Sequence, residues 1–582
     1  LSEHIILMRD AMRHGGPDGA GIFIDANYPL ALGHRRLSLI DLSGNGHQPM
    51  RDSDAEITIV FNGEIYNYQE LRKTLKSYGH LFKTETDTEV IIKAYLQWGD
   101  SAFELLNGMF AIAIWDEKKS QLLLARDHAG MKPLYYTKVG DVFCFASEIR
   151  AFEFSGISIE ENINWPLTFL AFGYIPEPYT SLHNVYTLEK GTLMKVDIPS
   201  LKISKSVFFQ WEMNGELKDE QEAIDLLRGT LQSAVSRHLI ADAPLGIFLS
   251  GGIDSSLLTL IAAQQKSTSL KTLSITFKEK GFSEKEYQDV IVQKAQTNHG
   301  AYEVTQNIFN EYLNDALVAM DQPSIDGINT YFISKFARAH GLKAVLSGIG
   351  ADELFGGYPT FKQYNEYRNL QELPNMLLSR LHYFPDQRVK KLSYAGMHHS
   401  AGEYLLMRGL FDVQSIADLL GASYTDIRNT LSGISSHYAC PALQNEDRIS
   451  WFETNYYMKN QLLKDADCMS MWHGLEIRMP FLDKEWMLMS SVIDSSLKFR
   501  NTPKYLLIKA FMQELPQEIW DRKKQGFSFP FDDWLKQNEY TQPVTTEEQH
   551  LYKLFQRKQI NWSRYWCALL MNRFSQKIAV AA

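Results

Sequence analysis

The chain has 582 residues, of which 45% are hydrophobic and 22% are charged. This composition is typical of a globular protein, and the length exceeds what a single hydrophobic core supports, so several domains are expected. The net charge of −10 argues against nucleic acid as the main partner. No run of about 18 apolar residues occurs, which predicts that no segment spans a membrane.

The four cysteines, Cys144, Cys440, Cys468 and Cys567, lie far apart and form no CxxC pair. This spacing suits neither a zinc site nor a disulfide framework, and it favours a reducing cytoplasm as the location. No secretory signal is evident. Because the first residue is Leu1 and not Met, the natural start is expected upstream of it.

The first part of the chain, residues 1–196, is predicted to be rich in short strands. Residues 57–61 and 110–115 are nearly continuously apolar, with β-branched and aromatic side chains, as in sheets covered on both faces. Helices are predicted at 68–77 and 89–98. A layered sandwich of sheets and helices is therefore the expected architecture.

Polar motifs interrupt this first part. Residues 33–38 place two arginines at a strand, and Arg is suited to gripping a carboxylate with two hydrogen bonds. Residues 61–66 contain an Asn-Gly turn, and residues 86–89 (Thr-Asp-Thr-Glu) predict a helix N-cap with a capping box. Taken singly, each motif is more often an ordinary turn or cap than a site.

A glycine-rich turn follows the apolar strand at 246–249. Its glycines would let backbone N–H groups approach a ligand, and the helix predicted from about Ser255 favours negative charge at its start. Asp254 would repel a phosphate unless a divalent cation bridged them, so the turn indicates Mg²⁺ with a polyphosphate. No Lys follows the glycines, which excludes a Walker A loop. On the turn alone, an ordinary strand–turn–helix is an equally good interpretation.

Helices and apolar strands alternate in the second part, residues 220–582. A helix is predicted at 223–238, and a further strand at 271–277. This βαβ rhythm predicts a doubly wound parallel sheet with ligands at the carboxyl ends of its strands, followed by a helical C-terminal region. The polar passage 197–219 is predicted to be the linker.

A second loop of the same kind follows the apolar residues 344–346. Ser347 and Gly348 are followed by the acidic pair Asp352 and Glu353. Two strands that end in Ser-Gly loops could bring Asp254 and Asp352 to one metal–polyphosphate group. Because chance is a poor explanation for two such loops, the functional interpretation is favoured here.

The motifs of the first part together resemble the glutaminase domain of the asparagine synthetase family. Counterparts of the family's His-Arg-Gly-Pro-Asp, Arg-Leu-Ser, Asn-Gly-Glu-Ile-Tyr and Asp-x-Glu segments occur in the same order. The resemblance implies an N-terminal-nucleophile (Ntn) hydrolase fold, an αββα sandwich. It also implies that glutamine is held by Arg36, Asn62, Gly63, Glu64 and Asp87. This set offers a cation for the substrate carboxylate and carboxylates for its ammonium group.

This first part departs from the family at two places. Gly15 stands where the family has Arg before Gly-Pro-Asp. The family's nucleophile is the amino-terminal Cys of a Cys-Gly-Ile opening, and no cysteine precedes Cys144, which lies in a predicted strand and has no free α-amine. The intact glutamine residues favour an opening segment that lies outside this sequence. The alternative is that glutamine hydrolysis has been abandoned.

The second part resembles the ATP-dependent synthetase domain of the same family. Residues 250–255 are similar to the pyrophosphate loop (PP-loop) of N-type ATP pyrophosphatases, and residues 475–483 match the family's Glu-x-Arg-x-Pro-Phe-Leu-Asp. The implied ATP-binding residues are Ser250, Gly251, Gly252, Asp254, Ser255, Ser256, Ile275, Ser347 and Gly348. The resemblance also implies Mg²⁺ ligation by Asp254 and Asp352, neutralisation of charge on the α-phosphate by Lys504, and a place for Glu353 in the acceptor or metal shell.

The resemblance implies two half-reactions. Glutamine releases ammonia in the first domain. In the second, a carboxylate attacks ATP to give an acyl-adenylate and pyrophosphate, and ammonia converts the adenylate to an amide. The expected partners are glutamine, ATP and a carboxylate acceptor, with Mg²⁺ as cofactor, and a homodimer is left open. Aspartate-using members carry Glu where this chain has Ile349, so the acceptor is aspartate or another carboxylate, such as a sugar acid or a cell-envelope intermediate.

Three alternative functions are less well supported by the sequence. A ligase or cyclase that uses only free ammonia or an internal amine is disfavoured by the intact glutamine residues. A non-catalytic sensor of ATP or glutamine is disfavoured because Asp254, Asp352 and Lys504 are all present. A PP-loop enzyme acting on tRNA is disfavoured by the acidic charge balance and the glutaminase-like first part.

Overall fold

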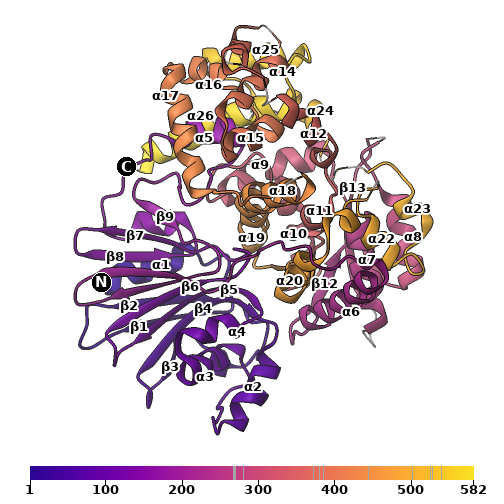
Figure 1. Cartoon of the computed structure of the whole chain (residues 1–582). Coiled ribbons are helices and arrows are strands. Elements are labelled where there is room, and N and C mark those ends of the chain that lie inside the picture. The colour runs from indigo at the N-terminus through magenta and orange to yellow at the C-terminus, as the bar shows by residue number, and fades with distance from the viewer. Residues whose placement is uncertain are drawn as a thin grey trace.

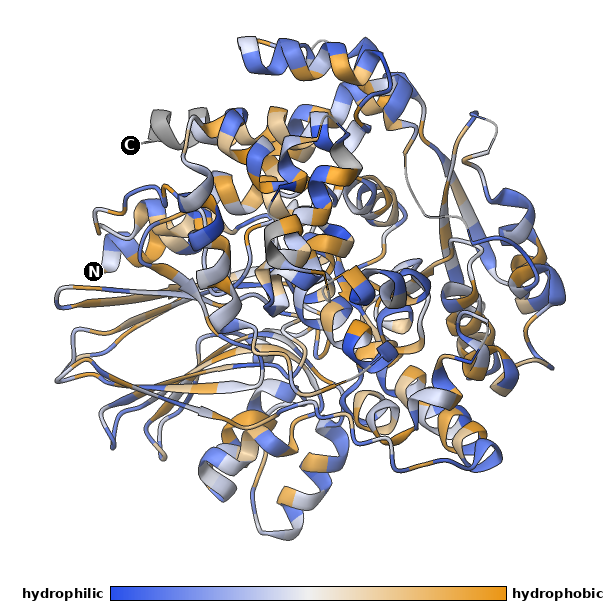
Figure 2. Ribbon diagram, turned by 45° about the horizontal axis from the view of Figure 1, so that its top comes forward, coloured by the Kyte–Doolittle hydropathy of each residue, from blue (hydrophilic) through white to orange (hydrophobic). Residues whose placement is uncertain are grey.

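The computed structural model describes residues 1–265, 270–279, 281–370, 373–378, 380–384, 386–443, 445–500, 502–524, 526, 529–538 and 541–581. Strands of the first part gather on one side of the molecule, and the helices of the second part form the rest (Figure 1). Many helices carry both hydrophilic and hydrophobic stretches, as expected of helices that cover a core (Figure 2). No helix in the described ranges is long and apolar enough to cross a membrane.

The first part is built from antiparallel strands. One sheet has the order β11-β10-β6-β5-β4-β3, and β1-β2 and β8-β7-β9 form two smaller sheets. These strands are β1 (Gly19–Ile24), β2 (Ala31–Arg36), β3 (Met50–Asp52), β4 (Ile57–Ile65), β5 (Gly108–Asp116), β6 (Gln121–Arg126), β7 (Tyr135–Val139), β8 (Val142–Ala146), β9 (Val185–Thr187), β10 (Thr192–Asp197) and β11 (Lys202–Val207).

Helices cover both outer faces of these sheets. They are α1 (Ser2–Ala11), α2 (Tyr68–Ser77), α3 (Asp87–Trp98) and α4 (Ala102–Leu105). One apolar cluster joins the six-stranded sheet to α2 and α3, a second fills the space between the sheets, and a third joins the sheet β8-β7-β9 to α1. The layers therefore follow the expected order helix, sheet, sheet, helix.

The second part contains a five-stranded parallel sheet of order β14-β13-β12-β15-β16. Its strands are β12 (Leu245–Phe248), β13 (Lys271–Thr276), β14 (Asn298–Glu303), β15 (Ala344–Leu346) and β16 (Glu476–Arg478). The helices around it are α6 (Glu220–His238), α7 (Ile253–Gln265), α8 (Lys285–Ala295), α9 (Gln306–Ala319), α10 (Ile328–Ala339) and α11 (Ala351–Phe355). Among these, α7 contacts β12, and α8 and α10 contact β13.

The remaining helices form the C-terminal region. They are α12 (Thr360–Leu370), α13 (Asn375–Leu378), α14 (Gln387–Lys391), α15 (Ser400–Arg408), α16 (Val413–Leu420), α17 (Tyr424–Ile434), α18 (Asn445–Phe452), α19 (Leu463–Met471), α20 (Lys484–Val492), α21 (Ser495–Lys498), α22 (Tyr505–Ala510), α23 (Gln517–Trp520), α24 (Phe531–Gln537), α25 (Thr546–Gln556) and α26 (Trp562–Ala581). A π-helical segment, Glu453–Leu462, joins α18 to α19.

Two segments near the predicted domain boundaries pack in ways that the sequence does not reveal. The strand β11 lies inside the predicted linker 197–219, yet it pairs along its length with β10 as the edge of the six-stranded sheet. The helix α5 (Trp165–Phe172) belongs by sequence to the first part, yet it packs against α15, α16 and α26 of the helical region (Figure 1). The boundaries themselves remain a prediction.

Candidate functional site

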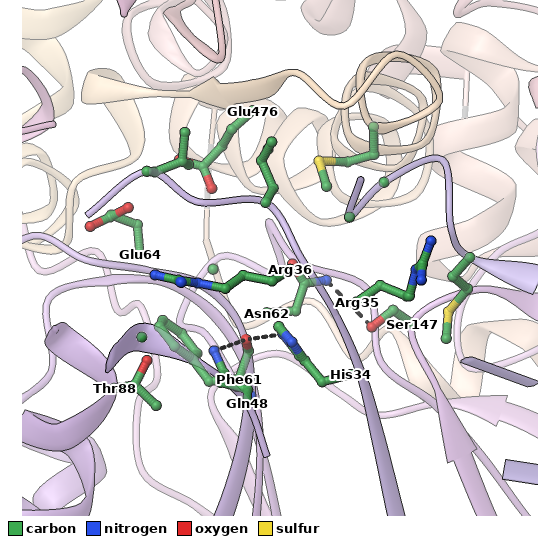
Figure 3. Close-up of a pocket in the computed structure, with 18 of the residues that line it drawn as sticks. His34, Arg35, Arg36, Gln48, Phe61, Asn62, Glu64, Thr88, Ser147 and Glu476 are labelled. Atoms are coloured by element: carbon green, nitrogen blue, oxygen red, sulfur yellow. Dashed lines mark hydrogen bonds between the residues drawn. The ribbon is translucent and has the colours of Figure 1, made fainter. Parts of the chain in front are cut away.

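A cavity of about 140 Å³ lies where β2 and β4 approach the start of α3. All five residues predicted to hold glutamine line it: Arg36, Asn62, Gly63, Glu64 and Asp87. Figure 3 shows Arg36, Asn62 and Glu64 extending into the same space. Residues from the second part of the chain, Asp467, Met471 and Glu476, close the cavity from the other side.

The strand β4 places two of these side chains. Asn62 and Glu64 are two residues apart and therefore lie on one face of the strand. Gly63 between them has φ +144°, and a Cβ there would lie 2.0 Å from the carbonyl oxygen of Met109 on β5. Only glycine permits this close approach. The amide of Asn62 donates a hydrogen bond of 3.3 Å to Oγ of Ser147, marked in Figure 3.

The guanidinium of Arg36 is held by the turn that follows β2. It donates to the carbonyl oxygens of Ser43 at 2.8 Å, Asp41 at 2.6 Å and Ile40 at 3.3 Å. A Cβ on Gly46 would lie 1.9 Å from Nη2 of Arg36, so this glycine leaves room for the cation. The turn therefore fixes a positive charge at the wall of the cavity.

Asp87 is the first residue of α3 and is buried. Its carboxylate accepts a hydrogen bond of 3.0 Å from the backbone N–H of Ile65. Burial raises the pKa of Asp87 to about 6, although that hydrogen bond opposes the shift. Thr86 caps the helix as predicted, but Glu89 accepts from the backbone N–H groups of Lys83 and Thr84, so the reciprocal half of the predicted capping box is absent.

Glu64 is paired with a residue of the second part. Its Oε2 accepts a hydrogen bond of 2.7 Å from Nη2 of Arg478, whereas its buried Oε1 has no hydrogen-bond partner among the residues that the structure describes. Burial raises the pKa of Glu64, and the guanidinium of Arg478 opposes that shift. Sequence reasoning missed Arg478 and Glu476, although both lie in the segment 475–483 that carries the family resemblance.

A second cavity, of about 540 Å³, lies at the carboxyl ends of β12 and β15. Seven of the nine residues predicted to bind ATP line it: Ser250, Gly252, Asp254, Ser255, Ile275, Ser347 and Gly348. Gly251 and Ser256 do not. The carbonyl of Gly251 accepts a hydrogen bond from Arg522, and Ser256 is fully buried within α7.

The two Ser-Gly loops meet at this cavity. A Cβ on Gly348 would lie 2.8 Å from Cβ of Asp254, so the loops touch. The ammonium of Lys504 lies 2.5 Å from Oδ2 of Asp254 and 2.5 Å from Oδ1 of Asp352. Lys524 also contacts Asp352, at 2.5 Å. Burial raises the pKa of Asp352, but the two ammonium groups lower it more, to about 2.

Glu353 and Ile349 line the same cavity. The Glu353 carboxylate accepts hydrogen bonds from the backbone N–H of Gly350 at 3.1 Å and from the hydroxyl of Tyr358 at 2.7 Å. Burial, with the neighbouring Asp352, raises the pKa of Glu353 to about 7. Both of its oxygens are therefore engaged within its own loop.

The residues at this cavity fit Mg²⁺ brought by a polyphosphate better than a metal held by protein alone. The described ranges contain no cluster of three or more His, Cys, Asp or Glu side chains arranged to hold a metal. Asp254 and Asp352 nevertheless lie close enough to share one cation, since a single ammonium contacts both. One or two carboxylates completed by phosphate oxygens and water are a usual Mg²⁺ environment.

A third, small cavity of about 40 Å³ lies between the other two. It shares Ser147, Glu148, Asp467 and Met471 with the first cavity, and Asp465 with the second. Asp465, Asp467 and Met471 all belong to α19, which therefore runs beside all three cavities.

Comparison with known proteins identifies the family. Residues 226–560 match the asparagine synthase family profile, and residues 1–208 match the glutamine amidotransferase domain profile. Asparagine synthetase [glutamine-hydrolyzing] 1 of Bacillus subtilis (strain 168) is 34% identical over 566 residues, which cover 94% of this chain and 87% of that protein. The chain belongs to the glutamine-hydrolysing asparagine synthetase family.

Other relatives in this family have similar coverage. Asparagine synthetase [glutamine-hydrolyzing] 3 of B. subtilis is 30% identical, covering 89% of this chain and 83% of its own length. A putative asparagine synthetase of Mycobacterium tuberculosis (strain ATCC 25618 / H37Rv) is 31% identical, covering 91% and 84%. A solved structure of glutamine phosphoribosylpyrophosphate amidotransferase from B. subtilis aligns at 14% identity and a TM-score of 0.28, covering 51% of this chain and 77% of that one.

Membership of the asparagine synthetase family confirms the predicted fold class and activity. The first part is an Ntn amidotransferase domain with antiparallel sheets, and the second is a parallel-sheet synthetase domain with a helical C-terminal region. The chain is a carbon–nitrogen ligase that carries out glutamine-dependent amide formation of the asparagine synthetase type. The family also implies that it uses ATP.

Proposed function

We propose that the first cavity binds glutamine, that the second binds ATP with Mg²⁺ and an acceptor carboxylate, and that ammonia passes between them. The observation that carries this proposal is the meeting of Asp254, Asp352 and Lys504 at the ends of two parallel strands. Domain boundaries at 1–196, 197–219 and 220–582 belong to the same proposal.

The first cavity offers an α-amino acid the charges that it needs. Arg36 would pair with the α-carboxylate of glutamine, and Glu64 and Asp87 with its α-ammonium group. The unpaired Oε1 of Glu64 supports this assignment, because a buried acceptor without a partner is costly until a ligand satisfies it. Asn62 and Gly63 would contribute a polar side chain and a close approach of the backbone.

The raised pKa of Asp87 predicts a pH dependence of binding. Above about pH 6 the carboxylate is ionised and attracts an ammonium group, and below pH 6 it becomes neutral. We therefore expect the affinity for L-glutamate, which cannot be hydrolysed, to fall roughly tenfold per pH unit below 6. Isothermal titration calorimetry from pH 5 to 8 measures this. Asp87→Asn should bind more weakly and lack the change near pH 6; an unchanged profile in this variant would contradict the role of Asp87.

The second cavity offers groups for a polyphosphate. The loops at Ser250 and Ser347 present hydroxyl and backbone N–H groups, and Asp254 and Asp352 would hold Mg²⁺. When bound, Mg²⁺ would offset negative charge on the phosphates. Lys504 would then stabilise the charge that develops on the α-phosphate as pyrophosphate leaves.

The third cavity supports transfer of ammonia from one site to the other. It adjoins both larger cavities and is of a size suited to molecules such as water or ammonia. A private route matters because an amine with a pKa of about 10 is less than about 1% unprotonated at pH 7. Ammonia kept from bulk water stays nucleophilic.

Aspartate is the acceptor that the lining of the second cavity supports best. Two carboxyl groups, Asp326 and Asp465, line the cavity, and they suit an acceptor with an ammonium group. Ile349, where aspartate-using members carry Glu, favours a second candidate, a hydroxylated carboxylate such as a sugar acid, whose hydroxyl groups could donate to the same carboxylates.

Release of pyrophosphate from ATP, with ammonium as the nitrogen source, tests this function. Ammonium makes the measurement independent of glutamine hydrolysis. We expect release to depend on aspartate and to be accompanied by asparagine. Pyrophosphate release that depends on a sugar acid and not on aspartate would show that the acceptor is a sugar acid. If no carboxylate of a panel supports release, the proposed ATP site is contradicted.

A further inference from the structure

Arg478, in β16 of the synthetase domain, is fully buried, and every nitrogen of its guanidinium has a partner. Its Nε donates to Glu476 at 2.9 Å, and Nη1 donates to the carbonyl oxygens of His238 at 3.1 Å and Ile240 at 2.5 Å. The remaining nitrogen, Nη2, donates to Glu64 at 2.7 Å. A planar guanidinium fixed at this many points cannot rotate freely, so it presents Nη2 to Glu64 in one direction.

Glu64 belongs to the glutaminase domain, so this ion pair crosses from one domain to the other. Of the two Glu64 oxygens, Oε2 accepts from Arg478. Within the described part of the chain Oε1 has no hydrogen-bond partner, and Glu64 lines the first cavity. The ion pair therefore sets which oxygen is available to a ligand. Figure 3 shows Glu64 beside Glu476, the other carboxylate that Arg478 contacts.

The backbone of Arg478 contacts the other site. Its carbonyl oxygen accepts a hydrogen bond of 2.8 Å from the N–H of Ser347, the residue that begins the second Ser-Gly loop. β16 pairs with β15 in parallel, with Arg478 opposite Leu346. One residue thus touches the ATP loop through its backbone and the glutamine site through its side chain.

We propose that Arg478 is a positioning residue of the glutamine site, supplied by the synthetase domain, which holds the Glu64 carboxylate so that its free oxygen receives the α-ammonium group of glutamine. This inference rests on the proposed glutamine site. Because the same residue anchors Ser347, the glutamine site is complete only while β16 is in its place beside the ATP loop.

The charge of the buried Glu64 carboxylate depends on this contact. Burial raises the pKa of Glu64, and Arg478 is the main group that opposes the shift. Without Arg478 the pKa of this carboxyl group would rise further, which favours the neutral form, and the neutral form cannot attract an ammonium group. Loss of Arg478 therefore predicts weak binding that recovers as the pH rises.

The test measures binding of L-glutamate by calorimetry to the full chain. For Arg478→Met we expect the dissociation constant at pH 7 to rise at least tenfold and to recover in part as the pH is raised. Arg478→Lys, which keeps the charge but loses the fixed fork, should lie between this variant and the unchanged protein. An affinity in Arg478→Met equal to that of the unchanged protein would overturn the proposal.

A double-mutant cycle separates this role from a purely structural one. If Arg478 acts through Glu64, the pair Glu64→Gln and Arg478→Met should bind L-glutamate as weakly as Glu64→Gln alone, whereas losses that add would overturn the proposal. The double variant removes the charge of Glu64 together with that of Arg478, and Glu476 alone then loses its contact with this cation. Arg478→Lys provides the same comparison with the charge retained.

Arg237→Met is the matched control. Arg237 pairs at 2.9 Å with Asp483, whose carboxylate also accepts a hydrogen bond of 3.1 Å from Asn107 of the first part, but Arg237 does not line the first cavity. We expect this variant to keep its affinity for L-glutamate; an equal loss would assign the effect to the interface in general and overturn the specific role of Arg478. If the unchanged protein binds no L-glutamate, the proposed glutamine site itself fails, an outcome distinct from a failure of Arg478 alone.

Discussion

Asp352→Asn is expected to abolish release of pyrophosphate from ATP. Its two oxygens contact Lys504 and Lys524 at 2.5 Å each, and its pKa of about 2 keeps it ionised at all working pH values. The amide keeps the shape of the side chain but removes the charge that would bind Mg²⁺ and orient both lysines. A loss of roughly 1000-fold is expected, the size found when a group that stabilises developing charge is removed.

The measurement is ammonium-driven pyrophosphate release at saturating ATP and Mg²⁺. Asp418→Asn, an exposed carboxylate of α16 that contacts Gln414, is the matched control and should be fully active. Thermal unfolding adds a second readout, because ATP with Mg²⁺ should raise the melting temperature of the unchanged protein and raise that of Asp352→Asn much less. An unaffected rate in Asp352→Asn would remove this residue from the proposed metal site.

The parts of the site that were predicted from sequence are those held in local motifs. Ser250, Asp254 and Ser255 lie within six residues of one another, and the glycines between them signal a backbone that approaches a ligand. A short strand followed by this turn and a helix can be recognised without knowledge of the rest of the chain. The helix predicted from about Ser255 begins earlier, at Ile253, because local signals place helix ends only approximately.

Gly251 and Ser256 were predicted as ATP-binding residues, yet they do not line the second cavity. Gly251 has φ +85°, a conformation in which its carbonyl faces Arg522 instead. Ser256 follows Ser255 in α7, and successive helical residues point about 100° apart, so it enters the core when its neighbour faces the cavity. Binding of ATP by Gly251 and Ser256 therefore stays a prediction. The structure shows that not every residue of this motif lines the second cavity.

The residues that distant segments contribute to the parallel sheet and to the first cavity could not be predicted from the periodicity of the sequence. The strand β14, Asn298-His-Gly-Ala-Tyr-Glu, is too polar to be recognised, because it lies at the edge of the sheet. The strand β16 has three residues and joins the sheet about 130 residues after β15, an insertion that only tertiary packing reveals. Asp467, Met471 and Glu476 reach the first cavity for the same reason.

Lys504→Met is expected to impair both catalysis and stability. Lys504 is 5% exposed in its side chain, has φ +58°, and lies between two carboxylates. Methionine fills a similar volume but removes the cation between Asp254 and Asp352, so that Asp352 keeps Lys524 and Asp254 loses its partner, which costs about 3 to 5 kcal/mol in a buried pair. Catalysis should fall by roughly 100-fold to 1000-fold, because the ammonium of Lys504 would no longer offset the developing charge on the α-phosphate.

Ammonium-driven pyrophosphate release and thermal unfolding together measure this. Mg²⁺ should restore part of the lost melting temperature of Lys504→Met, since it can take the place of the ammonium between the two carboxylates, but it should not restore the rate. Lys509→Met, a neighbouring and more exposed lysine of α22 that pairs with Glu220, is the control and should be close to normal in both measurements. A variant Lys504→Met that released pyrophosphate at the normal rate would show that the ammonium serves only to hold the two aspartates together before ATP binds.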